Sequence, residues 1–310
     1  CELRGRRPKT LWGYRQLCRL YVAPALGRVR VVDLRAAHVR QALQALTARG
    51  LSPTTVRHAR NAAHAALALA VRDGLLADNP AAQVQAPAAR RPALRWPTPD
   101  ELGVLLDTAR AAGDRLAALW TVAALAGCRP GELLGLGWGD VDWEAGRISV
   151  RRNLVKVPGR APVLAAPKTE KGRRALRLAP EAMEALRLHR TRQAALKLRL
   201  GGDYGGAWRE ADLVFATLTG TPLLPRNVDR AFKRALARAG LPETMRFYDL
   251  RHGNATLMLK AGVAPKVAAE RLGHATTALF QDTYAHMLGE LDQDAAEKIG
   301  AGLRRATARA

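Results

Sequence analysis

The sequence has few cysteines and no long apolar run. Its three cysteines, Cys1, Cys18 and Cys128, lie far apart, and none belongs to a Cys-x-x-Cys or His-rich pattern of the kind that holds zinc. No uninterrupted apolar run reaches the ~18–20 residues that span a bilayer, and no signal-peptide pattern opens the chain. These absences argue against a zinc module and a membrane protein. They favour a reducing, cytoplasmic setting.

Acidic residues are also scarce, which leaves a large positive charge. Lys and Arg number 50 against 27 Asp and Glu, a net charge of +23 in 310 residues. Residues 1–97 hold 17 basic and 4 acidic residues, net +13, whereas residues 98–310 hold 33 and 23, net +10. A charge of this size indicates a polyanionic partner. No convincing basic helix carries Trp or Phe on its other face, as a membrane-surface helix would, so nucleic acid is the expected partner.

The chain is long enough for two domains, each with its own core. The segments HVRQALQALTARG (38–50) and LSPTTVRHARNAAHAALALAVRDGLLADNP (51–80) have apolar residues at helical spacing, so a small all-helical domain is expected within residues 1–85. Residues 86–101 contain four prolines and a cluster of arginines, and we interpret residues 86–97 as an inter-domain linker. Thr98-Pro99-Asp100-Glu101 has the pattern of a capping box, so the second domain is expected to cover 98–310.

The second domain is predicted to be mainly helical with one small β interruption. Residues 146–180 contain alternating, β-branched segments separated by Pro-Gly and Lys-Thr-Glu-Lys-Gly turns, which predicts a three-stranded antiparallel sheet. Helices are expected to resume at about 181–199, 225–240, 249–261 and 265–272. The predicted fold class is therefore mainly α with a small antiparallel β-sheet.

Polar residues occur at unexpected places in three segments of this domain. Arg129 lies in a Gly-Cys-Arg-Pro-Gly turn before an apolar helix, and Glu132 follows at i+3, where it can cap the helix and hold the guanidinium. Tyr248 and Arg251 are separated by one helical turn and share a face, whereas His252 points elsewhere and is interpreted as structural. Taken alone, Arg129 is better interpreted as a surface arginine in a turn.

The third segment lies nearer the C-terminus. Gly273 ends a predicted helix and leads to His274 in the turn, and Tyr284 follows in GHATTALFQDTYAHM. Each residue alone has a plain interpretation, because His274 reads as a satisfied, half-buried histidine and Tyr284 as a packing aromatic.

The combination of motifs nevertheless resembles a known family. Gly-x-Arg-x-x-Glu-Leu, a Pro-Lys-Thr hairpin turn, Leu-Arg-His, Leu-Gly-His and Asp-Thr-Tyr-x-His occur here in that order. Together they resemble the catalytic signature of the tyrosine recombinases, in particular the phage-type integrases, and the resemblance covers nearly the whole chain. It implies that residues 1–85 form a helical (SAM-like) core-DNA-binding domain and that 98–310 form an α+β catalytic domain with a C-terminal tail.

The resemblance implies catalytic roles for several residues. Arg129 and Arg251 match the family's two arginines that clamp the non-bridging phosphate oxygens, and His274 matches its third phosphate ligand. Lys168 matches the hairpin lysine that protonates the leaving 5′ oxygen, with Lys171 as its nearest competitor. Planar forks of donors suit the charge that phosphoryl transfer places on the phosphate oxygens.

Tyr284 then becomes the nucleophile. It lies ten residues after His274, the spacing that the family shows, and its attack would give a 3′-phosphotyrosyl link and a free 5′ hydroxyl. That link conserves the phosphodiester energy, so no metal and no nucleotide cofactor is expected. His286, two residues further on, is interpreted as structural.

One position departs from the family's pattern. The family usually has histidine, sometimes lysine, three residues before the second arginine, and here that residue is Tyr248. An unperturbed tyrosine titrates near ~10, against ~6.5 for histidine, so it is a poor general base at neutral pH, although it can donate a hydrogen bond to a phosphate oxygen. This leaves the identity of the general base open.

The expected function is therefore site-specific cleavage and rejoining of double-stranded DNA at attachment or recombination sites. The resemblance implies a homotetramer on two DNA duplexes, accessory DNA-bending factors, and a place at the bacterial nucleoid in the cytoplasm. Two alternatives stay open: a type IB topoisomerase that relaxes DNA with similar residues, and a degenerate recombinase that only binds DNA. Many phage-type integrases have an N-terminal arm-binding domain, and the sequence, which opens at Cys1, leaves open whether one precedes it.

Overall fold

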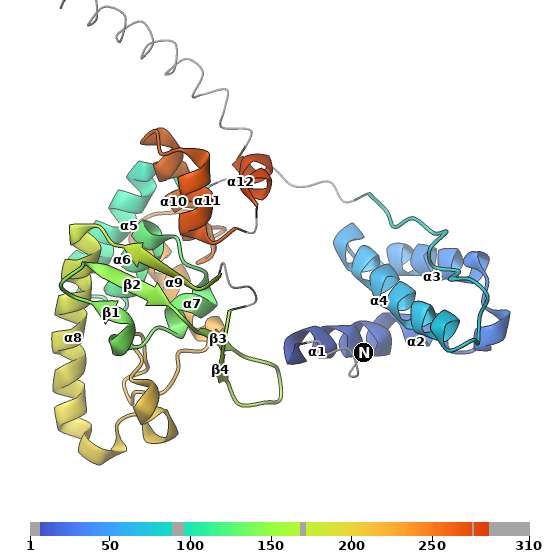
Figure 1. Ribbon diagram of the computed structural model, residues 1–310, viewed down its shortest axis with the longest axis horizontal. Coiled ribbons are helices and arrows are strands. Elements are labelled where there is room, and N and C mark those ends of the chain that lie inside the picture. Colours follow the sequence, from blue (N-terminus) through green and yellow to red (C-terminus); the bar gives the residue numbers. More distant parts are fainter. Residues whose placement is uncertain (1–6, 89–95, 168–171, 275, 285–310) are drawn as a thin grey trace, which may run out of the picture. The chain divides into compact units, whose positions relative to one another are not determined.

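The computed structural model describes residues 7–88, 96–167, 172–274 and 276–284. The chain divides into two compact units (Figure 1). The first unit comprises Cys1–Leu94 with Val157–Gly159, and the second comprises Arg95–Lys156 with Arg160–Ala310. Each unit has a hydrophobic core of its own.

Helices make up the regular structure described in the first unit. They are α1 (Pro8–Leu17), a π-helical turn (Cys18–Val22), α2 (Ala23–Leu26), a 3-10 turn (Val31–Asp33), α3 (Ala36–Ala48) and α4 (Pro53–Arg72). The helices predicted in 38–50 and 51–80 are α3 and α4.

The ends of α4 show how local chemistry sets a helix boundary. Ser52 caps the start of the helix, because its hydroxyl accepts the backbone N–H of Thr55 at 3.2 Å. The helix stops at Arg72 and not near the Asp-Asn-Pro sequence, since Gly74 has a φ of +75° and turns the chain out of the helix. The side chain of Asn79 instead donates to the carbonyl of His64, which holds the following turn against α4.

The core of the first unit consists of small aliphatic side chains. Val39, Leu43 and Leu46 of α3 pack with Val56 and Ala59 of α4, and all are buried. This spacing fills one helical face and leaves the charged residues of both helices on the other.

The first helix of the second unit begins with the predicted capping box. The backbone N–H of Thr98 donates to Glu101 at 2.9 Å, and the N–H of Glu101 donates to the Thr98 hydroxyl at 3.2 Å. The helices of this unit are α5 (Pro99–Ala111), α6 (Ala117–Ala126), α7 (Pro130–Leu134), α8 (Pro180–Leu200), α9 (Pro225–Arg238), α10 (Asp249–Lys260), α11 (Pro265–Leu272) and α12 (Thr277–Tyr284). The four predicted from 181 onward agree with α8–α11 to within two residues at each end.

The β structure differs from the predicted single sheet. β1 (Val141–Asp142), β2 (Arg147–Val150) and β5 (Arg174–Arg177) form a three-stranded antiparallel sheet in the order β1-β2-β5, with Ile148 opposite Leu176. β3 (Asn153–Val155) and β4 (Val163–Ala165) form a separate two-stranded sheet. The expected pairing was therefore wrong in detail: one strand comes from before residue 146, and the Pro-Gly turn belongs to its own hairpin.

Helix α6 lies at the centre of the second unit. Leu119, Trp120 and Val122 are fully buried, as expected for a helix that is apolar on every side. The Trp120 ring lies 5.2 Å from Phe232 and 5.3 Å from Phe247, so α9 and the segment before α10 are packed on α6. Figure 1 shows α10, α11 and α12 gathered at one end of this unit.

The architecture is mainly α with small antiparallel sheets, which confirms the predicted fold class. No helix in the described ranges is both long enough and apolar enough to cross a lipid bilayer.

Candidate active site

Arg129 lies at the start of α7, directly after the turn that ends α6. Its backbone N–H donates to Glu132 Oε2 at 2.9 Å, and its Nη1 donates to Glu132 Oε1 at 2.9 Å. Glu132 therefore caps the helix and orients the guanidinium at the same time, as its i+3 position predicts. The Glu132 side chain is 2% exposed, whereas that of Arg129 is 39% exposed.

The turn before Arg129 depends on Gly127. This residue has a φ of +62° and closes α6 in the left-handed conformation. A Cβ atom at this position would lie 2.4 Å from Asn254 Oδ1 and 2.7 Å from Leu272 Cδ2. Glycine therefore lets α6 approach α10 and α11 closely at the point where the site is assembled.

Arg251 projects from α10 toward the turn at Gly127 and the end of α11, and it is 2% exposed. Its Nη1 donates to the carbonyl of Gly127 at 2.8 Å, and its Nη2 donates to the carbonyl of Leu272 at 2.7 Å. Burial lowers the pKa of Arg251, and the neighbouring charge of Arg129 lowers it further. Two fixed carbonyls thus hold this guanidinium beside another of like charge.

A third guanidinium, that of Arg174 in β5, completes the cluster. Its Nη2 donates to Glu132 Oε2 at 2.9 Å, and its Nε donates to the carbonyl of Arg271 at 2.7 Å. Its side chain is only 8% exposed. The sequence analysis did not identify Arg174, because Arg173 directly precedes it, Arg177 ends the same strand, and nothing local distinguishes the three.

The C-terminus of α11 joins the three arginines. The successive carbonyls of residues 271, 272 and 273 accept from Arg174, Arg251 and Arg129 at 2.7, 2.7 and 2.9 Å. The last carbonyls of a helix have no partner within the helix and carry partial negative charge. This helix end is therefore a suitable acceptor for three cations that would otherwise repel one another.

His274 follows immediately after this helix end. Gly273, with a φ of +67°, turns the chain out of α11 as predicted. His274 Nδ1 is buried and has no hydrogen-bond partner among the described residues. Burial lowers the pKa of His274 to about 4, and the charges of Arg251 and Arg129 add to this effect. The imidazole is therefore neutral at pH 7, and its buried nitrogen differs from that of a satisfied core histidine.

Tyr248 lies just before α10, and His252 lies in its first turn, directly after Arg251. Tyr248 precedes the first residue of the helix, is 40% exposed, and has its ring 5.3 Å from that of His252 in an edge-on arrangement. His252 in turn stacks on Trp96, with ring centroids 3.8 Å apart. Tyr248 is thus an accessible phenol supported from behind by two rings.

The remaining candidates lie at or beyond the limits of the described structure. Lys168 and its competitor Lys171 lie outside the described residues, and so does His286. Tyr284 is the last residue of α12, and the description covers its backbone alone. The roles of Lys168 and Tyr284 therefore remain predictions.

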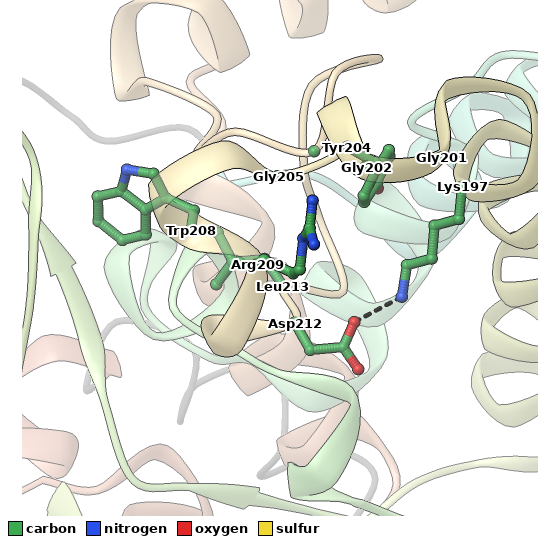
Figure 2. A pocket seen from close by; sticks show the side chains of 10 residues that line it. Lys197, Gly201, Gly202, Tyr204, Gly205, Trp208, Arg209, Asp212 and Leu213 are labelled. Carbon is green, nitrogen blue, oxygen red and sulfur yellow. Dashed lines mark hydrogen bonds and ion pairs between the residues drawn. The ribbon is translucent and has the colours of Figure 1, made fainter.

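A separate cavity lies at the C-terminal end of α8. It has a volume of about 270 Å³ and contains none of the site residues. Figure 2 shows Lys197 and Asp212 joined by an ion pair, which measures 2.5 Å, at this cavity. The only carboxylate that lines it is thus already paired, and the proposed chemistry does not use this cavity.

Comparisons of the chain with known proteins show the family to which it belongs. The model of the phage integrase family matches residues 95–290. The chain is 27% identical to a XerC-like tyrosine recombinase of Caldanaerobacter subterraneus subsp. tengcongensis, over 95% of this chain and 78% of the relative. It is 32% identical to the integrase of Mycobacterium phage L5, over 82% of this chain and 64% of the phage protein.

Solved structures show the same fold. The Tn1549 transposon integrase in complex with transposon right end DNA matches with a TM-score of 0.80 at 22% identity, over 96% of both chains. A lambda integrase dimer bound to a COC′ core site matches with a TM-score of 0.64 at 21% identity, over 90% of this chain and 73% of that one. The fold is thus one found in DNA integrases. The chain belongs to the phage integrase family, a family of tyrosine recombinases.

Proposed function

We propose that this protein is a site-specific recombinase that cleaves and rejoins duplex DNA through a 3′-phosphotyrosyl intermediate. One observation carries the proposal: Arg129, Arg251 and His274 converge on the C-terminal end of α11 with donors to spare. Because the chain covers 64% of the phage L5 integrase, the activity of the whole protein is part of this proposal.

Counting donors supports phosphate binding by the two arginines. A guanidinium has five N–H groups. Arg129 uses two, to Glu132 and Gly273, and Arg251 uses two, to Gly127 and Leu272. Three N–H groups on each remain without a partner among the described residues. A phosphodiester placed here would meet two planar forks, which suit the spread of charge over the non-bridging oxygens in the transition state.

His274 would add a further donor to the same phosphate. Its ring is neutral at pH 7, since burial and the arginine charges hold its pKa at about 4. A neutral imidazole carries one N–H and so can donate one hydrogen bond without adding charge. The buried, unpartnered Nδ1 indicates that the ring environment is completed by a ligand or by a shift of the side chain on binding.

Tyr284 is the proposed nucleophile. Helix α12 begins three residues after His274 and is anchored by Phe280, which is 1% exposed and packs with Leu272 and Ala268. Tyr284 follows Phe280 by one helical turn. In the proposed step its phenolic oxygen bonds to phosphorus while the bond from phosphorus to the 5′ oxygen breaks. The phenol loses its proton, and the leaving oxygen gains one from Lys168.

Tyr248 is proposed to donate a hydrogen bond to a phosphate oxygen. It stands one helical turn before Arg251 and its ring is accessible. A phenol in this position supplies a donor but no charge. The residue that accepts the proton of Tyr284 is left open by this assignment.

The proposed partner is duplex DNA, whose phosphates the basic first unit and the second unit would each contact. A structural relative, the Tn1549 integrase, is in complex with transposon right end DNA, and another, lambda integrase, is a tetramer bound to a Holliday junction. By analogy we propose a homotetramer on two duplexes, acting at the bacterial nucleoid in the cytoplasm.

A trapping experiment tests the proposal. The protein is incubated with nicked suicide duplexes of random sequence, in which cleavage releases a short fragment and prevents rejoining, and covalent complexes are recovered in SDS. Sequencing of the trapped DNA then gives a preferred duplex. Tyr284→Phe should abolish the covalent complex and spare DNA affinity, because it removes one oxygen and no charge. A full-strength complex from this variant would eliminate Tyr284 as the nucleophile.

A second assay separates recombination from simple relaxation. Two duplexes that carry the selected site should yield chimeric products, detected by amplification across the new junction. Relaxation of a supercoiled plasmid that lacks the site, without any chimeric product, would instead indicate a topoisomerase. Binding with neither activity would indicate a degenerate recombinase.

A further inference from the structure

Arg174 makes contacts of a different kind from those of the two proposed phosphate ligands. Its Nε donates to the carbonyl of Arg271, its Nη1 to Glu132 Oε1 at 3.2 Å and to the carbonyl of Gly172 at 3.3 Å, and its Nη2 to Glu132 Oε2. The fifth N–H direction points to Cys128 Sγ at 4.0 Å. All five donors are therefore directed at protein atoms, and none is left for a phosphate.

Glu132 links Arg174 to Arg129. Each of its two carboxylate oxygens accepts one hydrogen bond from Arg129 and one from Arg174. Burial opposes ionisation of Glu132, yet the hydrogen bonds and charge of Arg174, together with those of Arg129, hold its pKa below the ordinary value. The buried carboxylate is thus a charged bridge that fixes Arg129, on α7, relative to β5.

Arg174 also supports the turn that carries His274. A Cβ atom on Gly273 would lie 2.9 Å from Arg174 Nη1 and 3.1 Å from its Cζ. The guanidinium therefore lies directly against the backbone of Gly273 while its Nε holds the carbonyl of Arg271. The backbone from 271 to 273 cannot move toward β5 without displacing Arg174.

We propose that Arg174 is a positioning residue, which fixes Arg129 through Glu132 and His274 through the end of α11, without itself contacting the scissile phosphate. This inference rests on the proposed function. The three arginines thus have two roles. Arg129 and Arg251 bind the phosphate, and Arg174 fixes the residues that bind it.

Lysine cannot replace arginine in this position. An ammonium group is a point charge with three donors, whereas the site presents two carboxylate oxygens on one side and the carbonyl of Arg271 on another. Arg174→Lys keeps the positive charge beside Glu132 but loses the planar set of five N–H donors. The loss should shift Arg129 and His274 by a fraction of an ångström, and a misplacement of about 1 Å can slow a reaction about 100-fold.

The experiment compares Arg174→Lys and Arg174→Ala with a matched control, Arg177→Lys. Arg177 lies in the same strand and its side chain is exposed. Single-turnover cleavage of the selected nicked duplex should fall roughly 10- to 100-fold in Arg174→Lys and further in Arg174→Ala. DNA affinity and its dependence on salt should stay unchanged in both, and Arg177→Lys should cleave at the parental rate.

Amide hydrogen exchange provides a readout that does not need catalysis. The N–H groups of Gly273 and His274 donate to the carbonyls of Glu270 and Ala269, so exchange in 270–274 should become faster in both Arg174 variants while the core of α6 stays protected. A drop of about 0.9 in the salt slope would show that Arg174 binds a phosphate and would overturn the inference. Parental cleavage, or slow cleavage with unchanged exchange at 270–274, would overturn it too. Absence of a covalent complex from the parent protein would instead count against the proposed function, and the exchange data would still decide the positioning role.

Discussion

The arginines of the first unit and those around α11 differ in what they contact. Arg28, Arg40, Arg49 and Arg57 are exposed and have no acidic partner within residues 7–88. Arg251 and Arg174, by contrast, are buried and have backbone carbonyls or a carboxylate at hydrogen-bonding distance. These four arginines of the first unit are thus solvated charges, whereas Arg251 and Arg174 are held in fixed orientations by their acceptors.

The difference follows from the cost of burial. An exposed guanidinium keeps its water and contributes a field that attracts any phosphate. A buried one must be compensated by hydrogen bonds from the protein, and this compensation fixes its orientation. We therefore expect the exposed arginines of the first unit to contribute to DNA affinity, in a way that depends on salt. The arginines at the C-terminal end of α11 should instead determine the rate of cleavage, through their exact positions.

The largest expected effect is that of Arg251→Lys. This variant keeps the charge but loses the fork that reaches Gly127 and Leu272 at once. Single-turnover cleavage should fall about 10²- to 10³-fold, the range for loss of one preorganised donor to a developing oxyanion. Binding of uncleaved duplex should change little. Normal cleavage combined with weak DNA binding would contradict this expectation, because Arg251 would then contribute to affinity through its charge and not to the cleavage rate through its orientation.

The converse test removes charge from the first unit. The triple variant Arg40→Gln, Arg49→Gln and Arg57→Gln should lower the slope of log affinity against log salt by up to about 0.9 per arginine. Cleavage at saturating DNA should be unchanged. Arg110→Gln is the matched control, since Arg110 is exposed on α5 but already paired with Asp107 at 2.6 Å. An unchanged slope in the triple variant would show that these arginines do not contact DNA.

What could be predicted from the sequence is local in character. The Arg129–Glu132 pair lies within one helical turn next to a proline, and its geometry agrees with the expectation. The capping box at Thr98 and the positive-φ Gly273 are equally short-range features. Such patterns determine their own structure, because the contacting groups are three or four residues apart.

What could not be predicted depends on contacts across the chain. Arg174 bonds to Glu132 across 42 residues and to the carbonyl of Arg271 across 97. Most acceptors of the cluster are backbone carbonyls, which every residue has and which leave no mark on the sequence. The division of the β structure into two sheets likewise depends on β1 pairing with β2, a contact outside the segment with the alternating pattern.

A smaller effect is expected from Tyr248, which lies beside the buried arginine but is itself accessible. Tyr248→Phe should reduce cleavage by ~10-fold or less, consistent with losing one hydrogen bond to a charged group at ~1.5 kcal/mol. Tyr248→His should retain activity, and its pH–rate profile should gain a rise through the histidine range that the parent lacks. If Tyr248→Phe were as inactive as Tyr284→Phe, a role as simple donor would be wrong, and Tyr248 would have to be an essential acid or base.

The smallest effect concerns His252, which follows Arg251 on α10 and is partly buried. Burial lowers the pKa of His252 to about 4; Asp249 opposes the shift, and Arg251 and Arg246 add to it. In the unfolded chain His252 becomes protonated near the ordinary histidine pKa of 6.5, whereas in the folded protein it stays neutral down to about pH 4. The free energy of unfolding should therefore fall as pH drops from about 6.5 toward 4. His252→Phe keeps a ring between Trp96 and Tyr248 but cannot titrate, and its urea midpoint should fall less steeply over this range than that of the parent. Equal slopes in the variant and the parent would mean that His252 is no harder to protonate in the folded protein than in the unfolded chain.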